Sequence, residues 1–190
     1  MPELPDVEVF RRYMNSTALH QKISEVDISK TRILKTVSAA ELAGSLRGKS
    51  FNSTDRHGKN LFADTGENRL LRLHFGMTGF LKYFKDDSER PEHTRMLIIF
   101  DNGYKLAYSS QRLLGQLSLE NSVDEFVRKN KMGPDALKIS LSGLREIIEN
   151  SKGAIKSLLM DQSKIAGLGN IYADEMLFQT IILHSDFARQ

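Results

Sequence analysis

The chain has 190 residues, of which 40% are hydrophobic and 27% charged, and a formal net charge of +3, a composition typical of a globular protein with one or two domains. It contains no cysteine, which excludes disulfides, a thiolate nucleophile and a cysteine-based zinc site. Acidic residues near the N-terminus and the lack of a long apolar run argue against a signal peptide and a membrane helix, so a cytoplasmic protein is expected.

The first quarter of the chain predicts two helices. Apolar residues three and four positions apart predict a helix over residues 5–19. Ser38, with Glu41 three residues later, is typical of a capping box and predicts a short helix over residues 39–46 that ends before Gly48. The N-terminus is therefore expected to be anchored beside a packed helix.

A strand-rich region follows these helices. Short apolar and aromatic runs occur at residues 61–62, 70–75, 80–84, 96–100 and 104–108, separated by Gly, Asn and Asp. The segment Asp101-Asn102-Gly103 between the last two runs predicts a β-hairpin. This part of the chain is expected to form a β-sandwich or barrel-like domain with flanking helices.

The pattern becomes helical after about Glu120. Helical periodicity continues over residues 144–159 and again from Asn170 to Ile181, and Met132-Gly133-Pro134-Asp135 predicts a hinge. We therefore expect an α+β protein with a catalytic β-rich domain over residues 1–130 and a partial helical domain over residues 131–190.

The N-terminal residues could carry nucleophilic chemistry. Removal of Met1 would leave Pro2 with a free secondary amine, and a terminal amine titrates near pH ~8, so much of it is neutral at physiological pH. Such an amine could attack a sugar C1′ and form a Schiff base, while Glu3 could protonate the ring oxygen or shuttle protons. The alternative is that Pro2 and Pro5 only stiffen the terminus.

Three further segments combine glycine with basic or polar residues, in addition to the start Met1-Pro2-Glu3-Leu4-Pro5. They are Arg56-His57-Gly58-Lys59, His74-Phe75-Gly76-Met77-Thr78-Gly79 and residues 161–175, with the sequence DQSKIAGLGNIYADE. In this order the four segments resemble signatures of the formamidopyrimidine-DNA glycosylase and endonuclease VIII family, in particular its formamidopyrimidine branch. The last segment resembles the family's helix-two-turn-helix motif, and the resemblance covers essentially the whole chain.

The resemblance implies a role for five residues. Pro2 would be the nucleophile, Glu3 the general acid/base, and Lys59 would lie near the catalytic amine and the lesion phosphates. His74 and Asn170 would bind the DNA backbone; without the resemblance, His74 is simply a histidine at the end of a strand. Lys59 beside a glycine turn suits either phosphate binding or lowering the proton affinity of the Pro2 amine.

The two glycines of the helix-two-turn-helix segment have a physical reason of their own. Gly167 and Gly169 lack a Cβ atom, which would allow a tight double turn to approach a phosphate closely. Backbone amides at the start of the following helix favour an anion. Both glycines are therefore expected at the DNA-binding surface.

An enzyme that extrudes a nucleotide must fill the hole that the nucleotide leaves in the duplex. The resemblance assigns this to Met77, Arg112 and Leu114, here called the wedge residues; the alternative is one surface arginine and two core hydrophobes. The family pattern Asp-x-Arg-Arg/Lys-Phe-Gly is replaced by Ser110-Gln111-Arg112-Leu113-Leu114-Gly115. One basic residue and the aromatic side chain are thus missing, so lesion search or opposite-base preference is expected to differ.

Other departures affect smaller features and the end of the chain. Asp6 replaces a glutamate that lies near the damaged nucleotide in the family, and Ser185 stands where proline is common. The family continues through further helices, a base-recognition loop and a zinc or zincless finger, so a truncated form without the finger is expected. No metal site and no cofactor are expected in this chain.

The sequence leads to one main functional hypothesis and two alternatives. The main one is a bifunctional DNA glycosylase and abasic-site lyase of base excision repair. It would act on oxidised purines (8-oxoguanine, formamidopyrimidines) in double-stranded DNA, and would be nucleoid-associated if prokaryotic. The first alternative is a non-catalytic DNA- or damage-binding protein, inactive through truncation or a retained Met1. The second is an RNA-binding module, because the helix-two-turn-helix element also occurs in a ribosomal protein.

Overall fold

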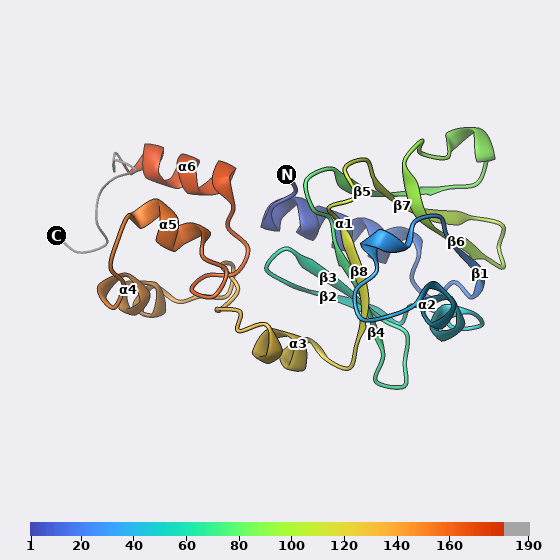
Figure 1. Cartoon of the computed structure of the whole chain (residues 1–190), viewed down its shortest axis with the longest axis horizontal. Helices are drawn as coiled ribbons and strands as arrows, with labels where there is room; N and C mark the ends of the chain where they lie inside the picture. Colours follow the sequence, from blue (N-terminus) through green and yellow to red (C-terminus); the bar gives the residue numbers. More distant parts are fainter. Residues whose placement is uncertain (181–190) are drawn as a thin grey trace.

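The computed structural model describes residues 1–180 of the chain, and Ile181 and Ser185 lie outside them. The N-terminal part is a sandwich of two antiparallel four-stranded sheets, which confirms the predicted α+β class (Figure 1). The first sheet has the order β1-β6-β7-β5 and the second the order β2-β3-β4-β8. The strands are β1 (Ile23–Ile28), β2 (Ser53–His57), β3 (Asn60–Asp64), β4 (Leu70–His74), β5 (Gly79–Phe84), β6 (Thr94–Phe100), β7 (Lys105–Ser110) and β8 (Gln116–Glu120).

Helices precede, interrupt and follow the sandwich. None of those in the described part is long and apolar enough to cross a membrane. The helices are α1 (Leu4–Thr17), α2 (Ala39–Leu46), α3 (Val123–Lys129), α4 (Leu141–Glu149), α5 (Ile155–Met160) and α6 (Asn170–Gln179), with short 3-10 turns at Thr31–Ile33 and Asp87–Glu89.

Local sequence signals explain several element boundaries. The Ser38 side chain accepts a hydrogen bond from Glu41 N at 3.2 Å, so the predicted cap does begin α2. Gly48 follows that helix at a φ of +78°, which glycine adopts without steric cost. The predicted hairpin joins β6 and β7, and Phe100 N donates to Tyr104 O at 2.9 Å across its turn.

The main hydrophobic core lies inside the sandwich and under α1. Val7 and Met14 of α1 are fully buried there, and α1 contacts strands of both sheets. A second, smaller core joins α5 and α6 through Leu158, Ala173 and Leu177. In Figure 1 these two helices and α4 form a separate group beside the sandwich.

Polar contacts connect the helical group to the sandwich. The Arg56 guanidinium makes two hydrogen bonds to the Asp135 carboxylate, at 2.6 Å and 3.0 Å, and both side chains are buried. Asp135 also accepts Gly58 N at 2.7 Å, and His57 Nε2 donates to Gly133 O at 2.9 Å. Hydrogen bonds therefore tie the segment over residues 132–135, where the sequence predicts a hinge, to β2 and its turn.

Candidate active site

The Glu3 side chain is buried against the first turn of α6. Glu3 is 1% exposed, and its carboxylate accepts hydrogen bonds from Gly169 N at 2.8 Å, Ile171 N at 2.8 Å and Tyr172 N at 3.3 Å. These N–H groups have no partner within a helix, and the positive end of the helix dipole lies there. Glu3 thus caps a helix that is 166 residues away in the sequence.

Gly167 and Gly169 leave room for this N-terminal segment. A Cβ atom on Gly169 would lie 2.5 Å from the Glu3 carboxyl carbon, and one on Gly167 would collide with Leu4 Cδ1. Gly167 has a φ of +118°, and its carbonyl accepts Leu4 N at 3.2 Å. The structure therefore gives both glycines a packing role against the N-terminus, and close approach to a phosphate stays a prediction.

Asp6 is exposed on the first turn of α1. Its Oδ2 accepts the Glu3 N–H at 2.8 Å, so it satisfies a donor at the start of that helix. Asp6 and the helix-two-turn-helix segment thus hold Glu3 by its backbone and its side chain respectively.

Met1, Lys59 and His74 meet at one cavity of about 260 Å³. Met1 is 47% exposed and Pro2 is partly buried. Met1 lines the cavity, and Pro2, which is bonded to it, does not. The complete lining is Met1, Lys59, Asn60, Arg72, His74, Phe126, Asn130, Met132 and Gln162.

Lys59 reaches this cavity from the turn between β2 and β3. Gly58, just before it, has a φ of +56°, and a Cβ atom there would lie 3.0 Å from Ala166 Cβ. Burial lowers the pKa of the Lys59 ammonium, while the charge of nearby Glu3 opposes the shift. Burial and the Glu3 carboxylate therefore act in opposite directions on the pKa of Lys59.

His74 ends β4 and contributes a neutral imidazole. Burial, followed by the charges of Arg72 and Lys59, lowers the pKa of His74 to about 4. Its Nδ1 accepts the Gly76 N–H at 3.3 Å, which assigns the remaining ring proton to Nε2. A neutral His74 can therefore donate one hydrogen bond through Nε2.

The wedge residues occupy two adjacent loops. Met77 is 41% exposed, Leu114 is 44% exposed and Arg112 is also exposed, so their side chains are accessible rather than part of the core. A Cβ atom on Gly76 would lie 2.5 Å from the Leu114 carbonyl carbon, and Arg112 N donates to Thr78 Oγ1 at 3.2 Å. The two loops are thus packed together, and none of the wedge residues lines the cavity.

Asn170 lies at the exposed start of α6. Its Nδ2 donates to Asp174 Oδ2 at 3.0 Å, and it does not line the cavity that contains Lys59 and His74. The predicted site residues therefore form three groups: the cavity, the Glu3 contact with α6, and the wedge loops.

Three residues of this region carried no role in the sequence analysis. Arg56 and Asp135 form the buried pair described above, and Arg72 lines the cavity from β4. Arg56 belongs to the same motif as Lys59, which was a usable signal. Arg72 stands alone as a cation in the apolar run Leu70-Leu71-Arg72-Leu73, a pattern that marks it as unusual but not as part of a site.

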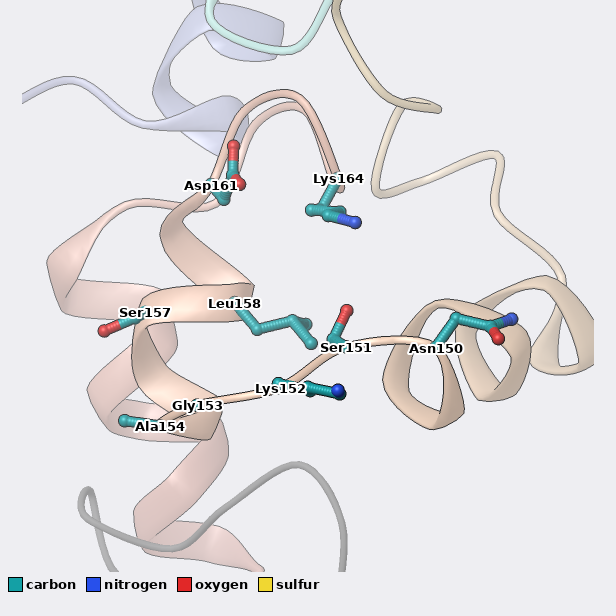
Figure 2. Close-up of a pocket in the computed structure, with 9 residues that line it drawn as sticks. All are labelled: Asn150, Ser151, Lys152, Gly153, Ala154, Ser157, Leu158, Asp161 and Lys164. Atoms are coloured by element: carbon teal, nitrogen blue, oxygen red, sulfur yellow. The ribbon is translucent and has the colours of Figure 1, made fainter.

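A larger cavity of about 550 Å³ lies in the helical group and contains none of the predicted site residues. Figure 2 shows its lining between the segment that joins α4 to α5 and the turn after α5, including Lys152, Asp161 and Lys164. Within residues 1–180, no cluster of three or more His, Cys, Asp or Glu side chains suited to a metal ion is present.

Two family models match the chain. The formamidopyrimidine-DNA glycosylase N-terminal domain matches residues 1–117, and the H2TH domain of the same glycosylase matches residues 132–190. The formamidopyrimidine-DNA glycosylase of Trichormus variabilis is 35% identical over 190 residues, covering 96% of this chain and 69% of the relative. That of Streptococcus pyogenes serotype M6 is 35% identical over 182 residues, covering 94% of this chain and 66% of the relative.

Solved structures of Lactococcus lactis Fpg have the same fold. A complex with DNA containing an abasic site has a TM-score of 0.91 and 30% sequence identity, covering 100% of this chain and 70% of the other. A complex with DNA containing FAPY-dG has a TM-score of 0.91 and 30% identity, covering 99% of this chain and 72% of the other. On the sequence and structural evidence together, the chain belongs to the formamidopyrimidine-DNA glycosylase family of DNA-repair enzymes.

Proposed function

We propose that this protein is a bifunctional DNA glycosylase and abasic-site lyase whose nucleophile is the Pro2 nitrogen. The observation that carries the proposal is the meeting of the N-terminus, Lys59 and His74 at one cavity. Glu3, the next residue, is fixed by three N–H donors of the helix-two-turn-helix segment. Such fixed geometry favours attack by a terminal amine.

The reaction begins with removal of Met1, which frees the secondary amine of Pro2. The Lys59 ammonium nearby favours the neutral form of this amine, because like charges disfavour a second cation. The Pro2 nitrogen attacks C1′ of the damaged nucleotide, the bond from C1′ to the base breaks, and the base leaves with a proton. The bond from C1′ to O4′ then breaks as Glu3 gives a proton to O4′, and the product is an iminium ion that joins Pro2 to the opened sugar.

The lyase step follows from this iminium ion. A base removes a proton from C2′, the bond from C3′ to its phosphate oxygen breaks, and the phosphate leaves as the anion. Glu3 is the proposed general acid/base for the proton transfers. Its Oε1 accepts a single backbone N–H, from Ile171, and so has a second lone pair for a substrate proton. Water then hydrolyses the iminium ion and restores the amine.

The proposed partner is damaged double-stranded DNA. The Lactococcus lactis relatives were solved with DNA that contains an abasic site or FAPY-dG, which supports a DNA substrate for this chain. Lys59, the Nε2–H of His74 and Asn170 would bind backbone phosphates around the damaged nucleotide, and Gly167 and Gly169 would let the turn approach them. Asp6 would lie near the extruded nucleotide.

Extrusion of that nucleotide is assigned to the wedge residues. Met77 and Leu114 would fill the space left in the duplex, and Arg112 would hydrogen-bond to the orphaned base. Their exposure on two packed loops supports this role, because a wedge must be accessible and firmly backed. The proposed lesions are oxidised purines such as 8-oxoguanine and formamidopyrimidines. The proposed chemistry uses an amine and needs no metal or organic cofactor.

Borohydride trapping tests the function directly. Protein from which Met1 has been removed, as verified by mass, is mixed with duplex DNA containing 8-oxoguanine and then reduced. A covalent protein–DNA product is expected, and it is expected to be weaker with DNA containing an oxidised pyrimidine. Protein that retains Met1 is the control, since its Pro2 nitrogen is an amide and cannot form the adduct. No product from the processed protein would contradict the enzymatic proposal.

A non-catalytic DNA-binding role is the second candidate. It would apply if Met1 is retained, because the Pro2 nitrogen would then be an amide and Met1 would line the cavity. Intact mass of the protein as produced in its own cell separates the two candidates: retained Met1 supports binding alone, and its loss supports catalysis.

A further inference from the structure

Arg72 is a buried cation beside the proposed phosphate-binding residues. It lies in β4 two positions before His74, so both side chains are on the same face of the strand. Arg72 is 8% exposed, which is unusual for arginine unless a negative partner compensates it.

The partners of Arg72 are neutral. Its Nε donates to Asn60 Oδ1 at 2.9 Å, Nη1 and Nη2 donate to Gln116 Oε1 at 3.4 Å and 3.3 Å, and Nη1 also approaches Ser118 Oγ at 3.5 Å. The Phe126 ring covers the guanidinium, 4.6 Å from its carbon. Within residues 1–180, no carboxylate forms an ion pair with Arg72. The charge of Glu120, farther away, raises the pKa of the guanidinium and partly offsets its burial.

The guanidinium lies where two cavities adjoin. The cavity that contains Lys59 and His74 and a second one of about 250 Å³ share Arg72, Phe126 and Asn130 in their linings. Lys35 and Lys129, both exposed, line the second cavity together with Glu120. The two adjoining cavities, here together called the cleft, are thus lined by the cations Lys59, Arg72, Lys35 and Lys129.

Arg72 keeps the capacity to bind an anion in this cleft. A guanidinium has five N–H donors, and the hydrogen bonds above use four, which leaves one Nη2 N–H without a protein acceptor in the described part of the chain. Burial lowers the pKa of Arg72 to about 10, so the group is still a cation at neutral pH. A buried cation held only by neutral groups is destabilising until an anion arrives.

We infer that Arg72 binds a backbone phosphate of the DNA strand that enters this cleft, as a phosphate ligand additional to Lys59 and His74. Asn60, Gln116 and Phe126 fix the guanidinium in place, so little side-chain entropy is lost when the phosphate binds. The inference rests on the proposed function in one respect, that DNA occupies the cleft. It does not depend on the chemistry of Pro2.

The test compares Arg72→Gln with Arg69→Gln. Arg69 is exposed just before the opposite end of β4, so its replacement removes the same charge without touching the cleft. Each folded variant is titrated, by fluorescence anisotropy at several salt concentrations, with a duplex containing a reduced abasic-site analogue. Loss of one phosphate contact makes the negative slope of log K against log salt less steep by about 0.9. The loss of affinity between about 50 and about 200 mM salt is then about 3.5-fold smaller than for the unmodified protein. We expect this loss for Arg72→Gln only, and equal slopes for the two variants would overturn the inference.

A second measurement uses the unmodified protein and so does not depend on the folding of a variant. The Nε–H resonance of Arg72 is followed by NMR while the same duplex, or inorganic phosphate, is added. A shift with the duplex is expected, with or without one for free phosphate. The inference would be overturned if the duplex caused no shift, whether or not inorganic phosphate caused one. Borohydride trapping of the unmodified protein reports separately on the proposed chemistry.

Discussion

The Glu3 carboxylate accepts the Gly169 N–H at 2.8 Å, and this contact joins the first residues of the chain to the helix-two-turn-helix segment. A DNA phosphate bound at that segment would therefore lie at a fixed distance from the Pro2 nitrogen. The N-terminal residues and the proposed phosphate-binding turn form one unit.

Gly169→Ala should disrupt that unit. Its new Cβ atom would lie 2.5 Å from the Glu3 carboxyl carbon, so either Glu3 or the α6 turn must move. We expect a loss of about 1–3 kcal/mol in stability and at least a tenfold loss of trapping rate. Gly44→Ala is the control, because nothing lies within 4 Å of a Cβ atom there and alanine should stabilise α2 by roughly 0.5–1 kcal/mol. Equal effects on trapping from both variants would contradict the account.

Arg56 and Asp135 should show strong coupling in urea unfolding. Arg56→Met or Asp135→Leu leaves one buried charge without its partner, at a cost of about 3–5 kcal/mol. The double variant should lose much less than the sum of the two single losses. Additive losses would mean that the pair does not hold the helical group to the sandwich.

The stability of the protein should depend on pH through His74. Its pKa falls to about 4 in the folded protein, from an ordinary value near 6.5. Between pH 4 and pH 6.5 the folded state therefore binds fewer protons than the unfolded state. The contribution of neutral His74 to the free energy of unfolding is present above pH 6.5 and is lost as the pH falls toward 4. His74→Gln should remove this part of the slope of unfolding free energy against pH. An NMR titration that places the His74 pKa near 6.5 would contradict the prediction.

The wedge residues should affect activity and not folding. Met77→Ala and Leu114→Ala change exposed side chains, so stability should stay within about 0.5 kcal/mol of the wild type. Excision of 8-oxoguanine from duplex DNA should slow by about tenfold or more, because filling the duplex offsets a few kcal/mol of lost stacking. Trapping on a preformed abasic site should change less. If both substrates slow equally, these side chains do not assist extrusion.

Local signals in the sequence predicted α1, α2 and the β6–β7 hairpin well, because capping, periodicity and turn chemistry act over a few residues. They missed β1, β2 and β8. All five positions of β2 (Ser53–His57) and half of those of β1 (Ile23–Ile28) are polar. The cross-strand pairing that stabilises these strands is not visible along the chain.

Site residues could be selected from the sequence where a motif is continuous, and contacts between distant segments could not. Lys59 and His74 were selected from glycine-containing motifs, and the structure brings them to one cavity. The capping of α6 by Glu3 joins residues 166 positions apart, and no local pattern predicts it. The role of Asp135 as the partner of Arg56 was hidden in the same way by a separation of 79 residues.

The most direct test of the account is to locate the covalent bond after borohydride reduction. The processed protein, cross-linked to a duplex with 8-oxoguanine, is digested and the modified peptide is sequenced by mass spectrometry. The account predicts a reduced deoxyribose adduct on the N-terminal nitrogen of the peptide that begins at Pro2. An adduct on Lys59 Nζ, or no adduct on any peptide, would contradict it.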